Sequence, residues 1–74
     1  MIPKLVFLRW SPGVRITLAS KERAGENVAM LPGEGTRYEA TVMPGEYRLH
    51  VGGWVTDVEV PPGRIPFDLG EDLS

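Results

Sequence analysis

The sequence predicts a small all-β protein, an antiparallel sandwich of about seven short strands, and three features support this prediction. Apolar residues alternate with polar ones in short segments, so that every second side chain lies on the same face of a strand. Pro-Gly recurs at 12–13, 32–33, 44–45 and 62–63, where it suits the corners of type I and type II turns. No helical pattern longer than a turn or two fits between these breaks. Short strands between frequent turns are typical of a sandwich or a small barrel.

The chain is short for a self-sufficient fold. Its 74 residues predict a single domain, 1–74, near the lower size limit for a core that is stable alone. At this size a core rarely supplies more than about 3–5 kcal/mol without disulfides, metal ions or oligomerisation. The sequence has no cysteine and one histidine, which excludes disulfides, thiolate metal sites and histidine clusters. Very good packing or a partner surface remains as the source of the additional stability. We therefore expect a protein partner or a homo-oligomer.

The charge and the apolar segments exclude several classes of function. A net charge of −2 without a basic stripe argues against nucleic-acid binding. The longest apolar run, 5–8, is too short to span a bilayer and lacks the features of a signal peptide, so we expect synthesis in the cytoplasm and no membrane insertion. Glutamine is absent and arginine outnumbers lysine, which fits a thermostable protein from a thermophile, although GC-rich coding produces the same bias.

Seven segments are predicted to form strands: 4–10, 14–19, 27–31, 36–42, 46–51, 54–60 and 65–69. Alternation directs one apolar set inward in each of two predicted strands. In the second strand this set is Val14, Ile16 and Leu18, and in the fourth it is Tyr38, Ala40 and Val42. Pro66 cannot donate a hydrogen bond to a neighbouring strand, so the last segment is expected at a sheet edge. The acidic residues 70–74 are expected to form a loose tail.

Two turns lead to specific predictions. Gly52-Gly53 suits a two-residue hairpin, because both glycines accept positive φ. The resulting register pairs Val51 with Trp54, Leu49 with Thr56, Tyr47 with Val58, and Arg48 with Asp57 on the opposite face. Pro44-Gly45 has the wrong twist for a tight hairpin, and we expect a wider corner that carries the chain from one sheet to the other.

These turns and strands carry a family resemblance. Residues 44–51 follow the pattern Pro-Gly-x-Tyr-x-Leu-x-Val within the segment 42–51, with Gly-Thr-Arg-Tyr before it at 35–38 and Gly-Trp after it at 53–54. Residues 13–18 match an earlier Gly-Val-x-Ile-x-Leu strand. The pattern resembles carboxypeptidase regulatory-like domains and is similar to collagen-adhesin B-type repeats and to the transthyretin-like sandwich in general. The resemblance implies a non-catalytic, immunoglobulin-like sandwich used as a spacer, adhesion or docking module. The Lys–Asn isopeptide bond of some relatives is not implied, because Lys4 and Lys21 have no matching asparagine late in the chain.

Residues suited to catalysis do not form a recognisable set. His50 is the one general base of the usual kind, and alternation points it outward beside Arg48, opposite either Val55 or a carboxylate such as Glu39. A catalytic pair needs a nucleophile and a third, positioning group, and neither is evident. We therefore expect no enzyme, no catalytic residue and no cofactor.

The acidic side chains also lack the pattern of a site. Asp57 and Glu59 share an outward strand face near Arg48, where a solvated ladder of charges explains them better than the paired carboxylates of a hydrolase. Glu71 and Asp72 lie in the expected tail, whereas hard cations need several oxygens held together. We expect no metal site.

Trp10 and Trp54 allow two interpretations. They can form a flat aromatic platform on which a sugar stacks, or they can cap the core from strand ends, as aromatic residues often do. Trp54 is in phase with Val58 and Val60, which favours the core for this residue.

The first strand departs from the two-faced pattern of a sandwich strand. Leu5 and Phe7 lie on one face, and the other face carries Val6, Leu8 and Trp10. Apolar residues on both faces predict that both faces are covered. Within the chain, the loops or the C-terminal segment can fold over the second face, or the strand can span both sheets. Alternatively, a partner covers this face by surface contact or strand addition. The small size favours a partner, and the predicted partner-binding residues are Leu5, Phe7 and Arg9.

We therefore expect a non-catalytic structural protein that docks on a larger assembly as one of several copies, or that associates with itself. A virion component such as a capsid decoration or a tail protein is one setting; a surface layer or another multi-subunit complex is a second. The alternative is a module that binds a glycan or another small ligand through Trp10 and Trp54.

Overall fold

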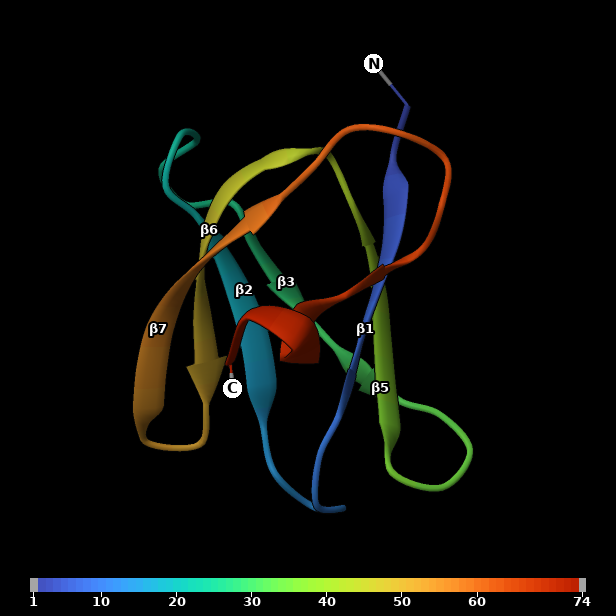
Figure 1. Ribbon diagram of the computed structural model, residues 1–74. Coiled ribbons are helices and arrows are strands. Elements are labelled where there is room, and N and C mark those ends of the chain that lie inside the picture. Colours follow the sequence, from blue (N-terminus) through green and yellow to red (C-terminus); the bar gives the residue numbers. More distant parts are fainter. Residues whose placement is uncertain (1, 74) are drawn as a thin grey trace.

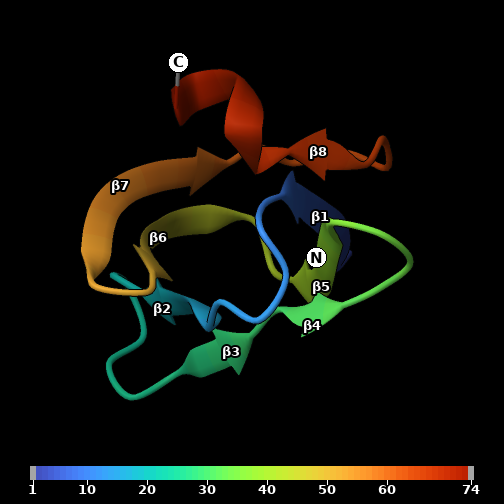
Figure 2. The same cartoon turned by 90° about the horizontal axis from the view of Figure 1, so that it is seen from below.

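In the computed structural model, which describes residues 2–73, the chain forms two four-stranded sheets packed face to face (Figures 1 and 2). Sheet A has the strand order β4-β5-β1-β8, and sheet B has the order β3-β2-β6-β7. The strands are β1 (Lys4–Arg9), β2 (Ile16–Ser20), β3 (Asn27–Ala29), β4 (Leu31–Pro32), β5 (Arg37–Val42), β6 (Gly45–Val51), β7 (Trp54–Val60) and β8 (Phe67–Asp68). All strand pairs are antiparallel except β1 with β8. The predicted all-β sandwich is confirmed.

The core lies between the two sheets and is built from alternate residues of the central strands. Leu18 and Leu49 are fully buried and lie directly opposite each other on β2 and β6. Val6 and Leu8 of β1 bury their side chains from the other sheet. Each such side chain contributes roughly 1.5–3 kcal/mol by leaving water. The predicted inward faces are confirmed: Ile16, Leu18, Tyr38 and Val42 are buried, and Val14 and Ala40 pack against them.

The β6–β7 hairpin has the predicted register. Val51 lies opposite Trp54, Leu49 opposite Thr56, Tyr47 opposite Val58, and Arg48 opposite Asp57. The turn itself differs from the prediction in one respect, because only Gly52 has a positive φ, of 59°. Positive φ at the first central position alone is typical of a type II′ turn. The glycine that this turn requires is therefore Gly52.

The chain changes sheets at four connections, β1–β2, β3–β4, β5–β6 and β7–β8. The connection around Pro44 is the wide corner that the sequence predicts between β5 and β6. The connection at Met30 is not predicted: the expected strand 27–31 divides there, with β3 pairing to β2 and β4 pairing to β5. Met30 itself is buried, and its N–H donates to the carbonyl of Ile16 at 2.9 Å. Met30 therefore marks the point where the chain passes from sheet B to sheet A, and its side chain lies in the core.

Two buried tyrosines fix connections at opposite ends of the sandwich. The hydroxyl of Tyr47 donates a hydrogen bond to the carbonyl oxygen of Met43 at 2.6 Å, across the β5–β6 corner. A tyrosine at such a corner whose hydroxyl returns to the upstream backbone recurs in antiparallel sandwiches. The hydroxyl of Tyr38 donates to the carbonyl of Ser11 at 3.0 Å and accepts the N–H of Val14 at 3.2 Å. These bonds hold the β1–β2 connection.

The C-terminal segment closes the side of the sandwich between β7 and β1 (Figure 2). Strand β8 follows Pro66 and lies at the edge of sheet A, as predicted. Leu69 is fully buried, whereas Ile65 is 79% exposed. A 3₁₀ helix, η1 (Leu69–Leu73), follows where the sequence predicts a loose tail; residue 74 of that tail lies outside the described residues. Regular structure therefore reaches further toward the C-terminus than the sequence indicates.

We expect the Tyr47→Phe variant to lose about 1–3 kcal/mol of unfolding free energy, because the carbonyl of Met43 then lacks its hydrogen-bond donor. Urea unfolding followed by tryptophan fluorescence measures this loss. Val55→Ala removes an exposed side chain and should change stability by no more than about 0.5 kcal/mol. Equal stability of Tyr47→Phe and the parent chain would show that the corner holds without the hydroxyl.

Candidate functional site

The outer face of sheet A carries the predicted partner-binding residues. Leu5 and Phe7 point away from the core and are half-buried, whereas Arg9 is exposed. Leu31 of β4 lies on the same face, because it is paired with Glu39 and Glu39 is paired with Phe7. Its exposed fraction is 69%. Sequence reasoning missed Leu31, because the expected strand 27–31 did not assign this residue to a separate strand of sheet A.

Arg37 covers part of Phe7 from within the chain. Its guanidinium lies 4.1 Å from the centroid of the Phe7 ring, which is a cation–π contact. The same guanidinium lies 3.8 Å from the carboxylate of Glu39. Arg37 is also directly opposite Arg9 on β1. Both interpretations of the two-faced first strand thus keep some support, because the chain supplies partial cover and leaves apolar surface beside it.

Trp10 and Trp54 meet at the end of the sandwich where β1 ends and β7 begins. Their ring centroids are 6.4 Å apart and their planes differ by 8°, so the rings are stacked. Trp10 is 38% exposed and Trp54 is 46% exposed. The prediction that Trp54 belongs to the core is therefore wrong. The residue has the inward phase of β7, but it is the first residue of that strand, where the sandwich ends.

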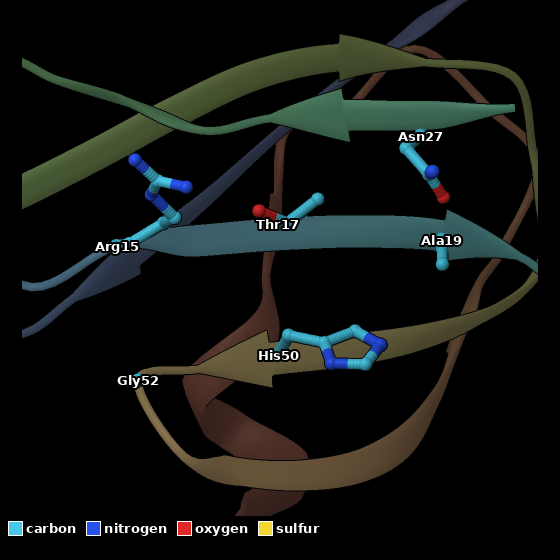
Figure 3. Close-up of a pocket in the computed structure, with 6 residues that line it drawn as sticks. All are labelled: Arg15, Thr17, Ala19, Asn27, His50 and Gly52. Atoms are coloured by element: carbon cyan, nitrogen blue, oxygen red, sulfur yellow. The ribbon is translucent and has the colours of Figure 1, made fainter.

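A third feature is a hollow of about 340 Å³ on the outer face of sheet B (Figure 3). Its lining residues come from β2, β3, β6 and the turns beside them: Arg15, Thr17, Ala19, Asn27, His50 and Gly52. Small side chains form its floor, because Ala19 and Gly52 fill little space beside the larger neighbours. Arg15, Asn27 and His50 stand around Thr17 and Ala19 (Figure 3). The sequence signal for this hollow is the pair of short outward side chains on β2, Thr17 and Ala19, and this pair alone does not predict a site.

Beside this hollow, two cations share one carboxylate. The ammonium of Lys21 donates to Oδ2 of Asp57 at 3.1 Å, and Nε of Arg48 lies 3.5 Å from Oδ1. The hydrogen bond and the charge of Lys21, followed by those of Arg48, lower the pKa of the Asp57 carboxyl. The predicted pairing of Arg48 with Asp57 is thus present, and Lys21 from the β2–β3 loop joins it.

The structure separates His50 from the carboxylate of Glu39. His50 lies between Thr17 and Val55 on its neighbouring strands, while Glu39 lies in the other sheet. Within residues 2–73, no group of three or more histidine, cysteine, aspartate or glutamate side chains is arranged to hold a metal ion. Over the same range, no helix is long and apolar enough to cross a membrane.

Comparison with family models, with curated proteins and with solved structures finds no match to this chain. The candidate sites therefore depend on the geometry of the chain alone.

We expect the pKa of the Asp57 carboxyl to lie below the ordinary aspartate value of about 3.9, and Lys21→Met to raise it. Because this pKa is lower in the folded state, the ion pairs stabilise the fold above the unfolded-state pKa, and their contribution disappears as the pH falls through the folded-state pKa. Carboxyl carbon chemical shifts followed through an acid titration measure both values. The matched variant Arg64→Met should leave the pKa unchanged, and an unchanged value in Lys21→Met would exclude the Lys21 contact.

Proposed function

We propose that this chain is a non-catalytic structural subunit that associates through the outer face of sheet A, with a second copy of the chain as its partner in a larger assembly. The observation that supports this most is the presence of Leu5, Phe7 and Leu31 together on one outer face. Apolar surface of this kind gains roughly 25 cal/mol per Å² when a partner removes it from water. The small size of the domain supports the same proposal, because its own core is limited.

The charges on this face favour a second copy as the partner. Arg9 and Arg37 are paired on β1 and β5, and Glu39 and Asp68 flank Phe7 in the next row of the sheet. Two cations and two carboxylates leave the face neutral overall. A twofold axis that runs across the strands, between the row of Phe7 and the row of Arg9, would bring the cations of one copy toward the carboxylates of the other. Twofold dimers use such self-complementary faces.

A particle built from many copies is the setting that we propose for this subunit, and a decorated virion is one example. The support is the small size of the chain, the apolar outer face of sheet A and, within residues 2–73, no group of histidine, cysteine, aspartate or glutamate side chains arranged to hold a metal ion. The immunoglobulin-like docking modules that the sequence resembles would serve in the same way.

The proposal predicts a change of solution mass on replacing Phe7. We expect the parent chain to form dimers or larger species, and Phe7→Asp to be monomeric, because a buried carboxylate at the centre of the interface is strongly unfavourable. Light scattering after size-exclusion chromatography measures the mass over a range of protein concentrations. Val55→Asp places the same charge on an exposed position of sheet B and should associate like the parent chain. A monomeric parent chain at all concentrations would remove the proposal.

The tryptophan stack supports a second candidate function, in which the chain binds a glycan. Trp10 and Trp54 have nearly parallel rings and keep part of their surface exposed, so a sugar ring has aromatic faces on which to stack. The stack lies at the end of the sandwich, away from the outer face of sheet A. The two candidate functions therefore use different residues and can be tested separately.

For the glycan proposal, we expect tryptophan fluorescence to change saturably with a soluble polysaccharide, and Trp54→Ala to weaken binding by about tenfold, which is about 1.4 kcal/mol. The Phe7→Asp variant should bind like the parent chain, because its substitution lies on sheet A. An absence of any fluorescence change across a panel of polysaccharides would set this function aside.

A further inference from the structure

The hollow on the outer face of sheet B is bordered by polar side chains that have no partner among the residues that the structure describes. The side chains of Arg15, Thr17, Asn27 and His50 make no hydrogen bond or ion pair with other residues in the range 2–73. All four border the same hollow (Figure 3). Together they offer a guanidinium, a hydroxyl, an amide and an imidazole. Such a set can donate several hydrogen bonds toward one bound group.

Strand pairing explains why these four side chains meet. His50 of β6 lies opposite Thr17 of β2, and Asn27 of β3 lies opposite Ala19 of β2. The N–H of Gly52 donates to the carbonyl of Arg15 at 2.9 Å, which places Arg15 beside the hairpin turn. Paired residues extend from the same face of a sheet. The short side chains between the longer ones leave the space that the hollow occupies.

The charge around the hollow is positive. Arg15 has no carboxylate partner in the described residues, and Lys21 and Arg48 share the single carboxylate of Asp57. A second space, which Lys21 and Arg48 line, shares Ala19 and His50 with the hollow. Glu46 and Glu59 lie on the same face and are paired with each other, beyond Arg48 and away from Arg15. An anionic group is therefore favoured at the Arg15 end.

We propose that this hollow is a binding site for a small polar ligand that carries an oxyanion, with a phosphate or sulfate ester as the preferred class. The guanidinium of Arg15 holds the anion, since its fork of N–H groups matches oxyanion geometry. His50 and Thr17 contribute further donors from the adjoining strands. This site does not depend on the association of sheet A and lies on the opposite face of the sandwich.

The length of the hollow indicates that the ligand is larger than the anion alone. Arg15 immediately precedes β2 and lies four residues before Ala19, or about 13 Å along extended backbone at 3.3 Å per residue. A free phosphate at Arg15 would leave Asn27, beside Ala19, without a contact. A ligand with an anionic end at Arg15 and hydroxyl groups near Asn27 occupies both ends. A sugar phosphate has this chemistry, and the volume of about 340 Å³ lies at the lower end of the range for small-molecule sites.

The test is a titration of isotope-labelled protein with glucose 6-phosphate, inorganic phosphate, acetate and glucose, followed by backbone amide chemical shifts. We expect saturable shifts at Thr17, His50 and Gly52, and the tightest binding for glucose 6-phosphate. Arg15→Gln should weaken both phosphate ligands by about tenfold or more, since a hydrogen bond to a charged group is lost. Asn27→Ala should weaken glucose 6-phosphate and leave inorganic phosphate unchanged.

The matched control is Arg64→Gln, which removes the same charge from an exposed position in the β7–β8 loop. It should bind glucose 6-phosphate within about twofold of the parent chain, a difference of about 0.4 kcal/mol. Equal weakening by Arg15→Gln and Arg64→Gln would mean that only net charge matters and would overturn the proposal. Shifts spread over all exposed arginines, or shifts that do not saturate, would also overturn it. If acetate binds more tightly than either phosphate ligand, the site prefers a carboxylate, and the proposed phosphate or sulfate ester is excluded.

Discussion

The pairing of β2 with β6 is the constraint on which the rest of the structure depends. Leu18 and Leu49 face each other across these two central strands, and neither is accessible to solvent. Because side chains alternate along a strand, burying this pair directs the intervening residues outward. Thr17 and His50 are therefore directed to a common outer face as a consequence of core packing. A slip by one residue would place polar groups in the core and is excluded by its cost.

The same constraint gives the two outer faces different chemistry. On sheet A, alternation that buries Val6 and Leu8 turns Leu5 and Phe7 outward, so apolar side chains remain on a surface. On sheet B, the outward side chains of β2 are short, and the longer side chains beside them border an open polar hollow. We propose contact with a second copy for the first face and a small anionic ligand for the second. A subunit that docks through sheet A would leave the hollow of sheet B accessible.

Several errors of prediction have a common physical origin. Alternation correctly assigned Trp54 to the inward side of β7. It does not show where the opposite sheet ends, however. Trp54 lies at the end of the sandwich, and 46% of its surface is exposed. The division of the strand 27–31 at Met30 has the same origin. A run of five residues has the propensity of one strand, and its separation into β3 and β4 depends on the two halves pairing with strands of different sheets. The 3₁₀ helix after β8 begins at Leu69, whose side chain is buried in the core between the two sheets, and the local sequence does not indicate this burial.

The sequence by itself determined the strand periodicity, the inward residues of the central strands, the β6–β7 register and the corner at Pro44. These features follow from local rules, because alternation and turn chemistry act over a few neighbouring residues. Only the tertiary structure decided that Leu31 lies in the same face as Phe7, that Trp10 stacks on Trp54, and that Arg15, Asn27 and His50 surround one hollow. Each of these groupings joins residues from separate strands. Their positions depend on which strands are neighbours, and that order is set by the shared core.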